Sequence, residues 1–397
     1  MNKKKVILRA PLLTNSGYGV HSRQIFEWLY NRTDVELTVE CLAWGRTSWI
    51  LKGEKENGII EKIMSCSKPI SQGSYDISIQ VQLPDEWDIS LAKKNIGITA
   101  LVETDKCSLE WVNRCNKMDS IIVPSTFTKN VLKRSGIVNC NVHVVPEWYN
   151  RHILNRSTVS KTLSDNRYDN IKKPFSILLI GTLTSQIPED DRKNLINTIK
   201  WIHEEFKGNE DVGIVLKTNF GKGTTHDKQL CKEYLRRFKS ELGIPKEDTF
   251  VTILHGNMES KEIASLYHHK NIKLYGSATR GEGYGLPLIE AAVAGLPIVA
   301  TGWSGHLEFL DKEYFGVVDY DLVEISKSRV DGRIFKEGFK WANPKEESFK
   351  KQIRKVYNDY EKSKQKAKTM MKKVRIDFSA GAIKSKYDEI FDEYIEK

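Results

Sequence analysis

The hydrophobic positions of the first 150 residues alternate between two periods. Short apolar runs, typical of buried strands, occur in KKVILRAP, ELTVECLAW, DISIQVQ, NIGITALVE, SIIVPS and NVHVVPEW. Between them, HSRQIFEWLYNR places four apolar residues on one helical face: Ile25, Phe26, Leu29 and Tyr30. STFTKNVLKRSG predicts a second helix, with Ser125 or Thr126 as its cap and Gly136 as its stop. This alternation predicts a parallel sheet covered by helices.

The same alternation starts again after a polar segment without a period, residues 155–174, which we expect to be a linker. Strands are predicted in FSILLIGTL, DVGIVLKTN, FVTILHG, NIKLYGS and LPIVATG. Helices are predicted in LINTIKWIHEEFKG, KQLCKEYLRRFKSELG, SKEIASLYHH, LPLIEAAVAG and SKYDEIFDEYIEK. The chain therefore predicts two α/β domains, in which ligands bind outside the carboxyl ends of the strands.

Length and composition agree with two globular domains. The chain has 397 residues, 40% of them hydrophobic and 29% charged with both signs mixed. Six cysteines are scattered without a C-x-x-C pair, which argues against a zinc site or a disulfide framework and favours a reducing cytoplasm. The N-terminal apolar run is broken by Arg9, so we expect no signal peptide and no transmembrane segment.

The net charge is +10, which suits a polyanionic partner. The excess is spread evenly, with 21 Lys and Arg against 16 Asp and Glu in residues 1–160, and 41 against 36 in the remainder. The densest cluster is KSKQKAKTMMKKVR, residues 362–375. It is either a solvated helix face or a contact with nucleic acid or an anionic membrane.

The segment RGEGYGLPLIEAAVAGLPIVAT carries the most specific pattern. Glu282 and Glu290 are separated by seven residues, and three glycines surround the first glutamate. Pro287 suits the first turn of a helix, and Gly295 suits its end. The free N–H groups of such a helix start attract a phosphate-like anion, while carboxylates accept hydrogen bonds from sugar hydroxyls. The pattern therefore indicates a site for a diphosphate flanked by two sugar rings.

This segment resembles the donor-site signature of retaining GT-B glycosyltransferases, the large Glu-x7-Glu family (family 4-like). The segments APLLTNSGYGVHSRQ and TALVETD are similar to those of phage-encoded members. The resemblance implies two Rossmann-like domains facing across a cleft. We expect an acceptor domain in residues 1–160 and a nucleotide-sugar domain in 161–378. Residues 379–397 would form a C-terminal helix that packs back toward the first domain.

The resemblance also implies roles for the residues of the motif. Glu290 would bind the ribose hydroxyls, and Glu282 would bind the transferred sugar. The backbone amides of four residues would meet the sugar and the diphosphate: Gly283, Tyr284, Gly285 and Leu286. The alternative is a capped helix start with solvated acids, which leaves the glycine density unexplained.

A basic pair fits a second position of the family. Its members place a cation at the first helix of the second domain, where it neutralises the diphosphate leaving group. Lys193 fits that position, with Arg192 beside it. Many relatives carry Gly-Arg at the preceding strand end, where this chain has Gly181-Thr182, so we interpret Arg192 as the substitute. The alternative is a pair of surface cations.

A glycine-rich loop follows the first strand in SGYGVHSR. The family has such a loop near the donor phosphates and the acceptor, and Ser16, Gly17 and Gly19 fit it. As a dinucleotide fingerprint the segment fails, because the third glycine is absent. A simple tight turn is the alternative.

One position departs from the family. Many relatives have a histidine after the strand NIGITALVE, where this chain has Glu103 followed by Thr104 and Asp105. Glu103 is a candidate for binding the donor sugar, and the departure leaves the identity of the sugar open. His306 either faces the cleft or is a satisfied loop histidine.

Nothing in the sequence requires a metal or another cofactor. Asp319 and Asp321 have the D-x-D form of metal-dependent glycosyltransferases of another fold, but they lie late in the chain and outside the donor motif. FGKGTT lacks the residues of a phosphate-binding P-loop. We therefore expect a metal-independent enzyme whose donor is a UDP-sugar, with a GDP-sugar as the alternative.

The expected activity is retaining hexosyl or pentosyl transfer to a hydroxyl acceptor. The acceptor is expected to be a bacterial surface glycan or glycolipid, made in the cytoplasm or at the inner membrane surface. A second hypothesis is a phage DNA glycosyltransferase acting on a hydroxymethylated base in the host cytoplasm. A third is a non-catalytic module that binds a nucleotide-sugar.

Overall fold

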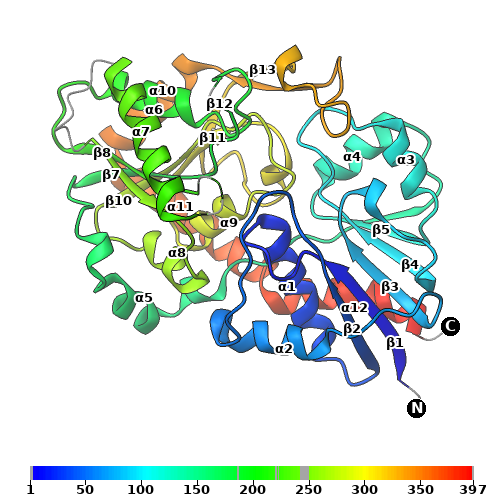
Figure 1. Ribbon diagram of the computed structural model, residues 1–397. Helices are drawn as coiled ribbons and strands as arrows, with labels where there is room; N and C mark the ends of the chain where they lie inside the picture. The colour runs from blue at the N-terminus through cyan, green and yellow to red at the C-terminus, as the bar shows by residue number, and fades with distance from the viewer. Residues whose placement is uncertain (1–2, 186, 220, 222, 242–249, 396–397) are drawn as a thin grey trace. The chain divides into compact units, whose positions relative to one another are not determined.

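The structure, a computed structural model, describes residues 3–185, 187–219, 221, 223–241 and 250–395 (Figure 1). Its contacts divide the chain into two units. The first unit comprises Met1–Trp148, Asp331–Phe339 and Asp377–Lys397, and the second comprises Tyr149–Val330 and Lys340–Ile376. Within the described ranges, no helix is both long and apolar enough to cross a bilayer.

The first unit is built on a parallel sheet of six strands, in the order β2-β1-β3-β4-β5-β6. Its strands are β1 (Lys4–Ala10), β2 (Val35–Cys41), β3 (Tyr75–Val81), β4 (Ala92–Ile98), β5 (Ser120–Val123) and β6 (Asn141–Val144). Its helices are α1 (Gly17–Tyr30), α2 (Ile59–Cys66), α3 (Leu109–Cys115), α4 (Thr126–Ser135) and α12 (Ala380–Ile395). As predicted, Ser125 caps α4 by accepting the Thr128 N–H, and the helix stops at Gly136.

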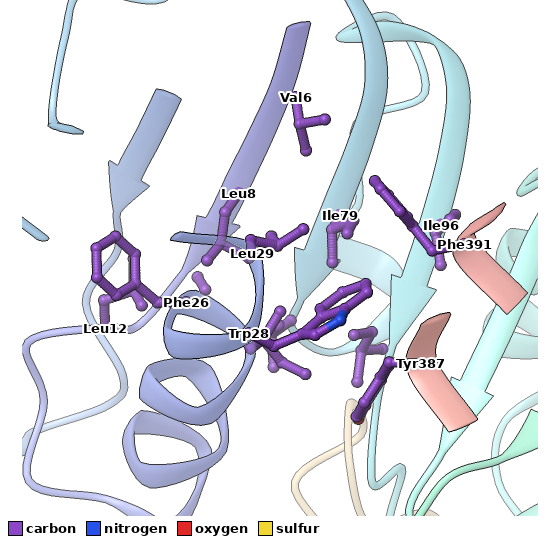
Figure 2. Close-up of a cluster of buried hydrophobic side chains, with 14 of the residues drawn as sticks. Val6, Leu8, Leu12, Phe26, Trp28, Leu29, Ile79, Ile96, Tyr387 and Phe391 are labelled. Atoms are coloured by element: carbon purple, nitrogen blue, oxygen red, sulfur yellow. The ribbon is translucent and has the colours of Figure 1, made fainter. Parts of the chain in front are cut away.

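The two ends of the chain meet in the core of the first unit. Trp28 of α1 packs against Tyr387 and Phe391 of α12, with ring centroids 5.1 Å apart in both pairs (Figure 2). The indole N–H of Trp28 and the guanidinium of Arg32 both donate to Asp388. The periodic apolar face predicted at the C-terminus therefore completes a core that the first 148 residues leave open.

A short segment from the middle of the second unit's sequence also belongs to the first unit. It runs from Asp331 to Phe339 and buries Phe335 and Phe339. Arg333 holds it by pairing with Asp85 at 2.6 Å and with Glu86 at 2.6 Å.

The second unit contains another parallel six-stranded sheet, in the order β12-β11-β10-β7-β8-β9. Its strands are β7 (Phe175–Ile180), β8 (Val212–Thr218), β9 (Val251–His255), β10 (Ile272–Ser277), β11 (Ile298–Thr301) and β12 (Gly316–Val318). Its helices are α5 (Arg156–Leu163), α6 (Leu195–Glu205), α7 (Thr225–Glu241), α8 (Ser260–Leu266), α9 (Leu286–Val293), α10 (Glu346–Asn358) and α11 (Tyr360–Asp377). The α/β prediction with two Rossmann-like sheets is confirmed, because a crossover helix joins most successive parallel strands.

Two further strands extend the second unit beyond its main sheet. β13 (Tyr320–Glu324) and β14 (Lys340–Pro344) pair antiparallel. The chain between them makes the excursion into the first unit described above.

The expected linker at residues 155–174 is wrong in part, because the segment contains structure. Asn155 caps α5 by accepting the Thr158 N–H, and Val159 is buried. Tyr168 is also buried and donates to the Glu262 carbonyl at 3.1 Å. These few anchoring residues hold an otherwise polar segment on α8. The polar composition of the segment gives no indication of this packing. The predicted domain boundaries, residues 1–160, 161–378 and 379–397, remain predictions, because they concern which parts of the chain fold independently.

Candidate functional site

The candidate site lies in the second unit, where the chain leaves β7 and β10. Because both strands are parallel, their carboxyl ends meet at one edge of the sheet. The loop after β7 leads to the start of α6 and carries Arg192 and Lys193. The loop after β10 leads to α9 and carries Glu282, in a run of buried residues from Gly281 to Gly285. The topology thus brings the two sequence-predicted motifs together.

Lys193 and Glu282 form the centre of the site. The Lys193 ammonium donates to both carboxylate oxygens, at 2.6 Å and 2.9 Å. Arg192 lies on the same carboxylate at 3.5 Å and donates a shorter bond of 2.7 Å to the Gly281 carbonyl. The three side chains are only 10% to 18% exposed, so water screens this cluster weakly.

The electrostatics of Glu282 follow from this geometry. Burial alone would raise the pKa of its carboxyl, but the charges of Lys193 and Arg192 outweigh burial and lower the pKa to about 2. Glu282 is therefore a carboxylate at any physiological pH. It can accept hydrogen bonds from hydroxyl groups and cannot act as a proton donor.

A buried aspartate shapes the loop that presents the two cations. Asp191 accepts the backbone N–H of Lys193 at 3.2 Å and that of Leu195 at 2.7 Å. It also accepts the Thr184 hydroxyl at 2.7 Å. Asn194 adopts a left-handed conformation with φ of 52° directly before α6. The Lys193 backbone is therefore held by hydrogen bonds as well as by its side-chain contact.

The start of α9 is formed by backbone rather than by a capping side chain. Gly285 is the N-cap, with φ of 105°, a conformation that other residues rarely adopt. The Glu282 N–H donates to the Ser304 hydroxyl at 2.9 Å, and the Gly305 N–H donates to the Glu282 carbonyl at 2.8 Å. A Cβ atom on Gly305 would lie 2.0 Å from the Gly283 carbonyl oxygen. The loop after β11 thus packs backbone against backbone and holds Glu282 in place.

Glu290 sits within α9 and has a different environment. It is buried and accepts the Tyr267 hydroxyl at 2.9 Å. Burial raises the pKa of Glu290 to about 7, although the bond from Tyr267 lowers it. Burial raises the pKa of the Tyr275 hydroxyl on β10, and the charges of Glu282 and Glu290 raise it further. The two glutamates of the motif therefore differ in protonation near neutral pH: Glu282 is ionised, and Glu290 is partly protonated.

His306 is a structural histidine rather than a group facing solvent. It is fully buried, and its Nε2 lies 2.7 Å from the Thr301 carbonyl, to which it donates. Burial lowers its pKa, so the ring is neutral and its Nδ1 faces the Ser304 hydroxyl at 3.4 Å.

Sequence reasoning missed Arg280, which ties the two loops of the site together. Its backbone N–H donates to the Arg192 carbonyl at 2.8 Å, and its guanidinium donates to Asn343 at 2.6 Å. The guanidinium also lies over the Trp341 ring, 5.6 Å from the centroid. Its position one residue before the glycine run was the available signal. Tyr267, Asp191 and Ser304 carried no such signal, because their roles depend on contacts distant in sequence.

The remaining predicted site residues lie in the first unit. Ser16 accepts the Gly19 N–H at 2.9 Å and so caps α1, as a tight turn would require. A Cβ on Gly19 would lie 2.2 Å from the Thr14 carbonyl oxygen, whereas Gly17 faces open space. Glu103 is partly exposed in the loop after β4. These residues share the carboxyl edge of the first sheet, where the chain leaves β1 and β4.

Among the described residues, no group of three or more His, Cys, Asp or Glu side chains could hold a metal ion. Asp321 of the D-x-D segment pairs with Lys345 at 3.2 Å, and Asp319 accepts the Ser348 hydroxyl. The chemistry that the site offers is therefore two cations, a fixed carboxylate, a second carboxyl that titrates near neutrality, and a helix start. Such a set suits an anion joined to hydroxyl-bearing rings.

Residues 229–380 match the family described as family 4 glycosyltransferases in conflict systems. No curated protein matches the chain. Three solved structures have similar folds over nearly the whole chain. Anabaena Alr3699/HepE in complex with UDP and glucose is 14% identical, covers 98% of this chain and 100% of its own, and has a TM-score of 0.68.

The other two are a glycosyltransferase from Rickettsia africae and sucrose-phosphate synthase from Thermosynechococcus elongatus. The first is 13% identical, with 100% of both chains covered and a TM-score of 0.67. The second is 12% identical, with 99% of this chain and 100% of that chain covered and a TM-score of 0.64. Together with the two parallel sheets, these comparisons establish that the chain has the GT-B fold.

Proposed function

We propose that this protein is a nucleotide-sugar-dependent glycosyltransferase of the family 4 type. The observation that carries the proposal is the buried pairing of Lys193 with Glu282 beside the start of α9. It joins a cation for a leaving diphosphate, an acceptor for sugar hydroxyls and the positive end of α9 at one sheet edge. The match over residues 229–380, which contains the whole donor motif, supports the same function.

The donor is proposed to lie along the carboxyl edge of the second sheet. Lys193 and Arg192 would meet the diphosphate, and backbone amides of Gly283, Tyr284, Gly285 and Leu286 would meet the phosphates and the sugar. Glu282 would accept hydroxyls of the transferred sugar. In the free protein, Lys193 and Glu282 neutralise each other, so the donor would enter with the diphosphate facing the cation and the sugar facing the carboxylate.

Glu290 is proposed to bind the ribose, and a UDP-sugar is proposed as the donor, with a GDP-sugar as the alternative. The complexes of Alr3699/HepE with UDP and with UDP-glucose support a uridine nucleotide for this fold. A carboxyl group accepts hydrogen bonds from hydroxyls best when it is ionised, so the Glu290 carboxyl should lose its proton when ribose binds.

Transfer is proposed to retain the anomeric configuration without a metal. The acceptor oxygen would form the new glycosidic bond on the face from which the nucleoside diphosphate departs. The departing β-phosphate would take the acceptor proton. The protein would supply charge stabilisation through Lys193 and Arg192, and Ser16, Gly17, Gly19 and Glu103 of the first unit would contribute to the phosphate and acceptor sites.

Two acceptor classes remain as proposals. The first is a hydroxyl of a bacterial surface glycan or glycolipid. The second is a hydroxymethylated base in DNA, and the lysine-rich face of α11 favours it, because duplex DNA carries a dense line of phosphates.

The test is to incubate the protein with UDP- and GDP-sugars and measure released nucleotide, with and without hydroxymethylated DNA or glycolipid. Lys193→Ala should reduce release at least about a hundredfold, since it removes charge stabilisation of the leaving group. Lys200→Ala, on the helix α6 that follows Lys193, is the matched control, because Lys200 is 43% exposed and pairs only with Glu204 in the described contacts. Turnover of Lys193→Ala equal to that of Lys200→Ala would contradict the proposal.

A further inference from the structure

The exposed side of α11 carries a dense run of cations. Between Lys362 and Arg375 the helix carries seven cations and no acidic residue. The acids nearest in sequence, Glu361 and Asp377, lie just outside this stretch. None of the functional residues discussed above lies on this helix.

The cations on the inner side of α11 have structural partners. Lys364 donates to the Gly295 carbonyl at 2.7 Å, and Arg375 donates to the Val293 carbonyl at 2.9 Å. These carbonyls close the C-terminal end of α9, where a positive charge is favourable. Figure 1 shows α11 beside α9. Lys366 lies on the exposed side, yet it also donates to a carbonyl, that of Glu313, at 2.9 Å. The inner cations therefore anchor the helix.

The outer lysines have no such role. Lys362, Lys368, Lys372 and Lys373 are exposed, and their side chains take part in none of the ion pairs or hydrogen bonds among the described residues. Lys368 and Lys372 are one turn apart, which places like charges side by side. Burial lowers the pKa of Lys364, and the nearby charges of Lys368 and Lys273 lower it further. An external anion would relieve the repulsion between these like charges.

The neutral residues of the same face distinguish between kinds of polyanion. Gln365 and Thr369 are exposed between the lysines. Lysine, glutamine and threonine are side chains that contact the phosphates and sugars of DNA. A helix that lies in a membrane surface instead needs a large apolar face. Here Ala367, Met370 and Val374 are buried inside the protein, and the exposed Ile376 alone does not make a large apolar face.

We propose that the exposed face of α11 is a docking surface for the phosphate backbone of duplex DNA. An 18-residue helix is about 27 Å long, enough to follow several phosphates of one strand. The contact would be independent of base sequence, because it involves flexible lysines and no groove-reading element. The duplex would lie at the C-terminal end of α9, whereas the loop that carries Glu282 precedes the N-terminal end of the same helix. The proposal does not depend on catalysis at the donor site.

The experiment measures binding of a short labelled DNA duplex by anisotropy at several salt concentrations from about 50 to 200 mM. The test variant carries four substitutions: K362Q, K368Q, K372Q and K373Q. The matched control carries K207Q, K232Q, K351Q and K355Q, which change four exposed lysines on α7, α10 and the end of α6. Both variants lose the same net charge. Calorimetry with UDP checks that each variant keeps its second unit intact.

We expect the wild-type affinity to fall steeply with salt. Each phosphate contact contributes about 0.9 to the slope of log K against log salt, so the α11 variant should lose roughly 3 to 4 from that slope. The control variant should lose clearly less. Equal losses in both variants would overturn the proposal, because net charge alone would then explain binding. Absence of duplex binding by the wild type would also overturn it.

A third outcome would replace DNA by a membrane. If the wild type floats with vesicles of phosphatidylglycerol, ignores the duplex, and loses flotation in the α11 variant, the surface is a membrane contact and the proposal is wrong. Failure of the DNA proposal is distinguishable from failure of the proposed function. Loss of duplex binding leaves nucleotide release from UDP-sugars intact, and an inactive donor site leaves the salt slope unchanged.

Discussion

The phenol of Tyr267 donates a 2.9 Å hydrogen bond to the Glu290 carboxylate, and both groups are buried. The bond crosses from α8 to α9 and joins two elements of the second unit. Because burial raises the pKa of Glu290 to about 7, the bond forms with a carboxyl that is partly protonated at neutral pH. Donor affinity should therefore depend on pH in a direction that the structure specifies.

We expect a UDP-sugar to bind about tenfold more tightly at pH 8 than at pH 6, because the ionised fraction of Glu290 rises by that factor. Binding of a ribose hydroxyl to the carboxylate should release a proton. Isothermal calorimetry in buffers of different ionisation heat measures both effects. A UDP-sugar is the right probe, because its phosphodiesters do not titrate in this range.

Two variants make the assignment specific. Glu290→Gln should bind weakly with no pH dependence between pH 6 and 8. Tyr267→Phe removes the bond that favours the ionised carboxyl, so the midpoint should move to higher pH. A wild-type affinity that is constant from pH 6 to 8 would remove Glu290 from the ribose site.

Glu282 should stabilise the fold above its unfolded pKa. Its folded pKa is lowered from 4.5 to about 2, so the stabilisation is present above pH 4.5 and is lost as pH falls through 2. The shift corresponds to about 3 kcal/mol in the free energy of unfolding. Glu282→Gln should therefore be less stable than wild type by about this amount at pH 7.

Urea unfolding at pH 7 and pH 3 measures this difference. The gap between wild type and Glu282→Gln should narrow at pH 3, because protonation of Glu282 removes the same charge that the substitution removes. A gap of equal size at both values of pH would show that the substitution acts through packing and not through the ion pair with Lys193.

Gly305→Ala should displace residues 281–285 in the loop after β10, which carries Glu282. Its new Cβ would lie 2.0 Å from the Gly283 carbonyl oxygen, so one backbone must move. We expect donor affinity to fall at least about tenfold together with a loss of stability, since overpacking typically costs 1–3 kcal/mol. Gly381→Ala in α12 is the control, because its Cβ would meet no atom within 4 Å. Unchanged donor affinity in Gly305→Ala would contradict this prediction, because the loop would then move without affecting donor binding.

Phe391→Ala should destabilise the first unit. The ring is 1% exposed, packs on Trp28 and lies under the Arg32 guanidinium at 5.0 Å. Truncation of a buried phenylalanine costs about 3–5 kcal/mol. Chemical denaturation measures the cost, and Ile137→Ala is the control, because Ile137 is 80% exposed. A cost below 1 kcal/mol, as for a surface residue, would contradict the burial of α12 in this core.

Much of the fold could be predicted because strands such as β3, β7 and β8 are buried almost throughout. Such strands appear in the sequence as short apolar runs, and helices with an apolar face separate the runs. β13 was missed because it lies outside the main sheets and most of its residues are exposed or partly exposed. α2 was missed because it has only eight residues, of which two are buried.

The site was predictable only where its residues are neighbours in sequence. Glu282, Gly285 and Glu290 share one segment, and their spacing follows from one loop and one helix. Tyr267 meets Glu290 across 23 positions, and Ser304 meets Glu282 across 22. These contacts arise from the packing of α8, α9 and the loop after β11, so no local pattern contains them.

The composition of the first unit has a consequence for synthesis on the ribosome. Tyr387 and Phe391 belong to its core, yet they are made after residues 1–148 and after the second unit. The second unit has all of its strands and helices by the end of α11. Residues 1–148 are translated first, but part of their hydrophobic core stays exposed until α12 is made. The second unit is translated later and can complete its own core before that. For this protein the order of maturation runs against the direction of translation, and chaperone demand should be concentrated on nascent residues 1–148.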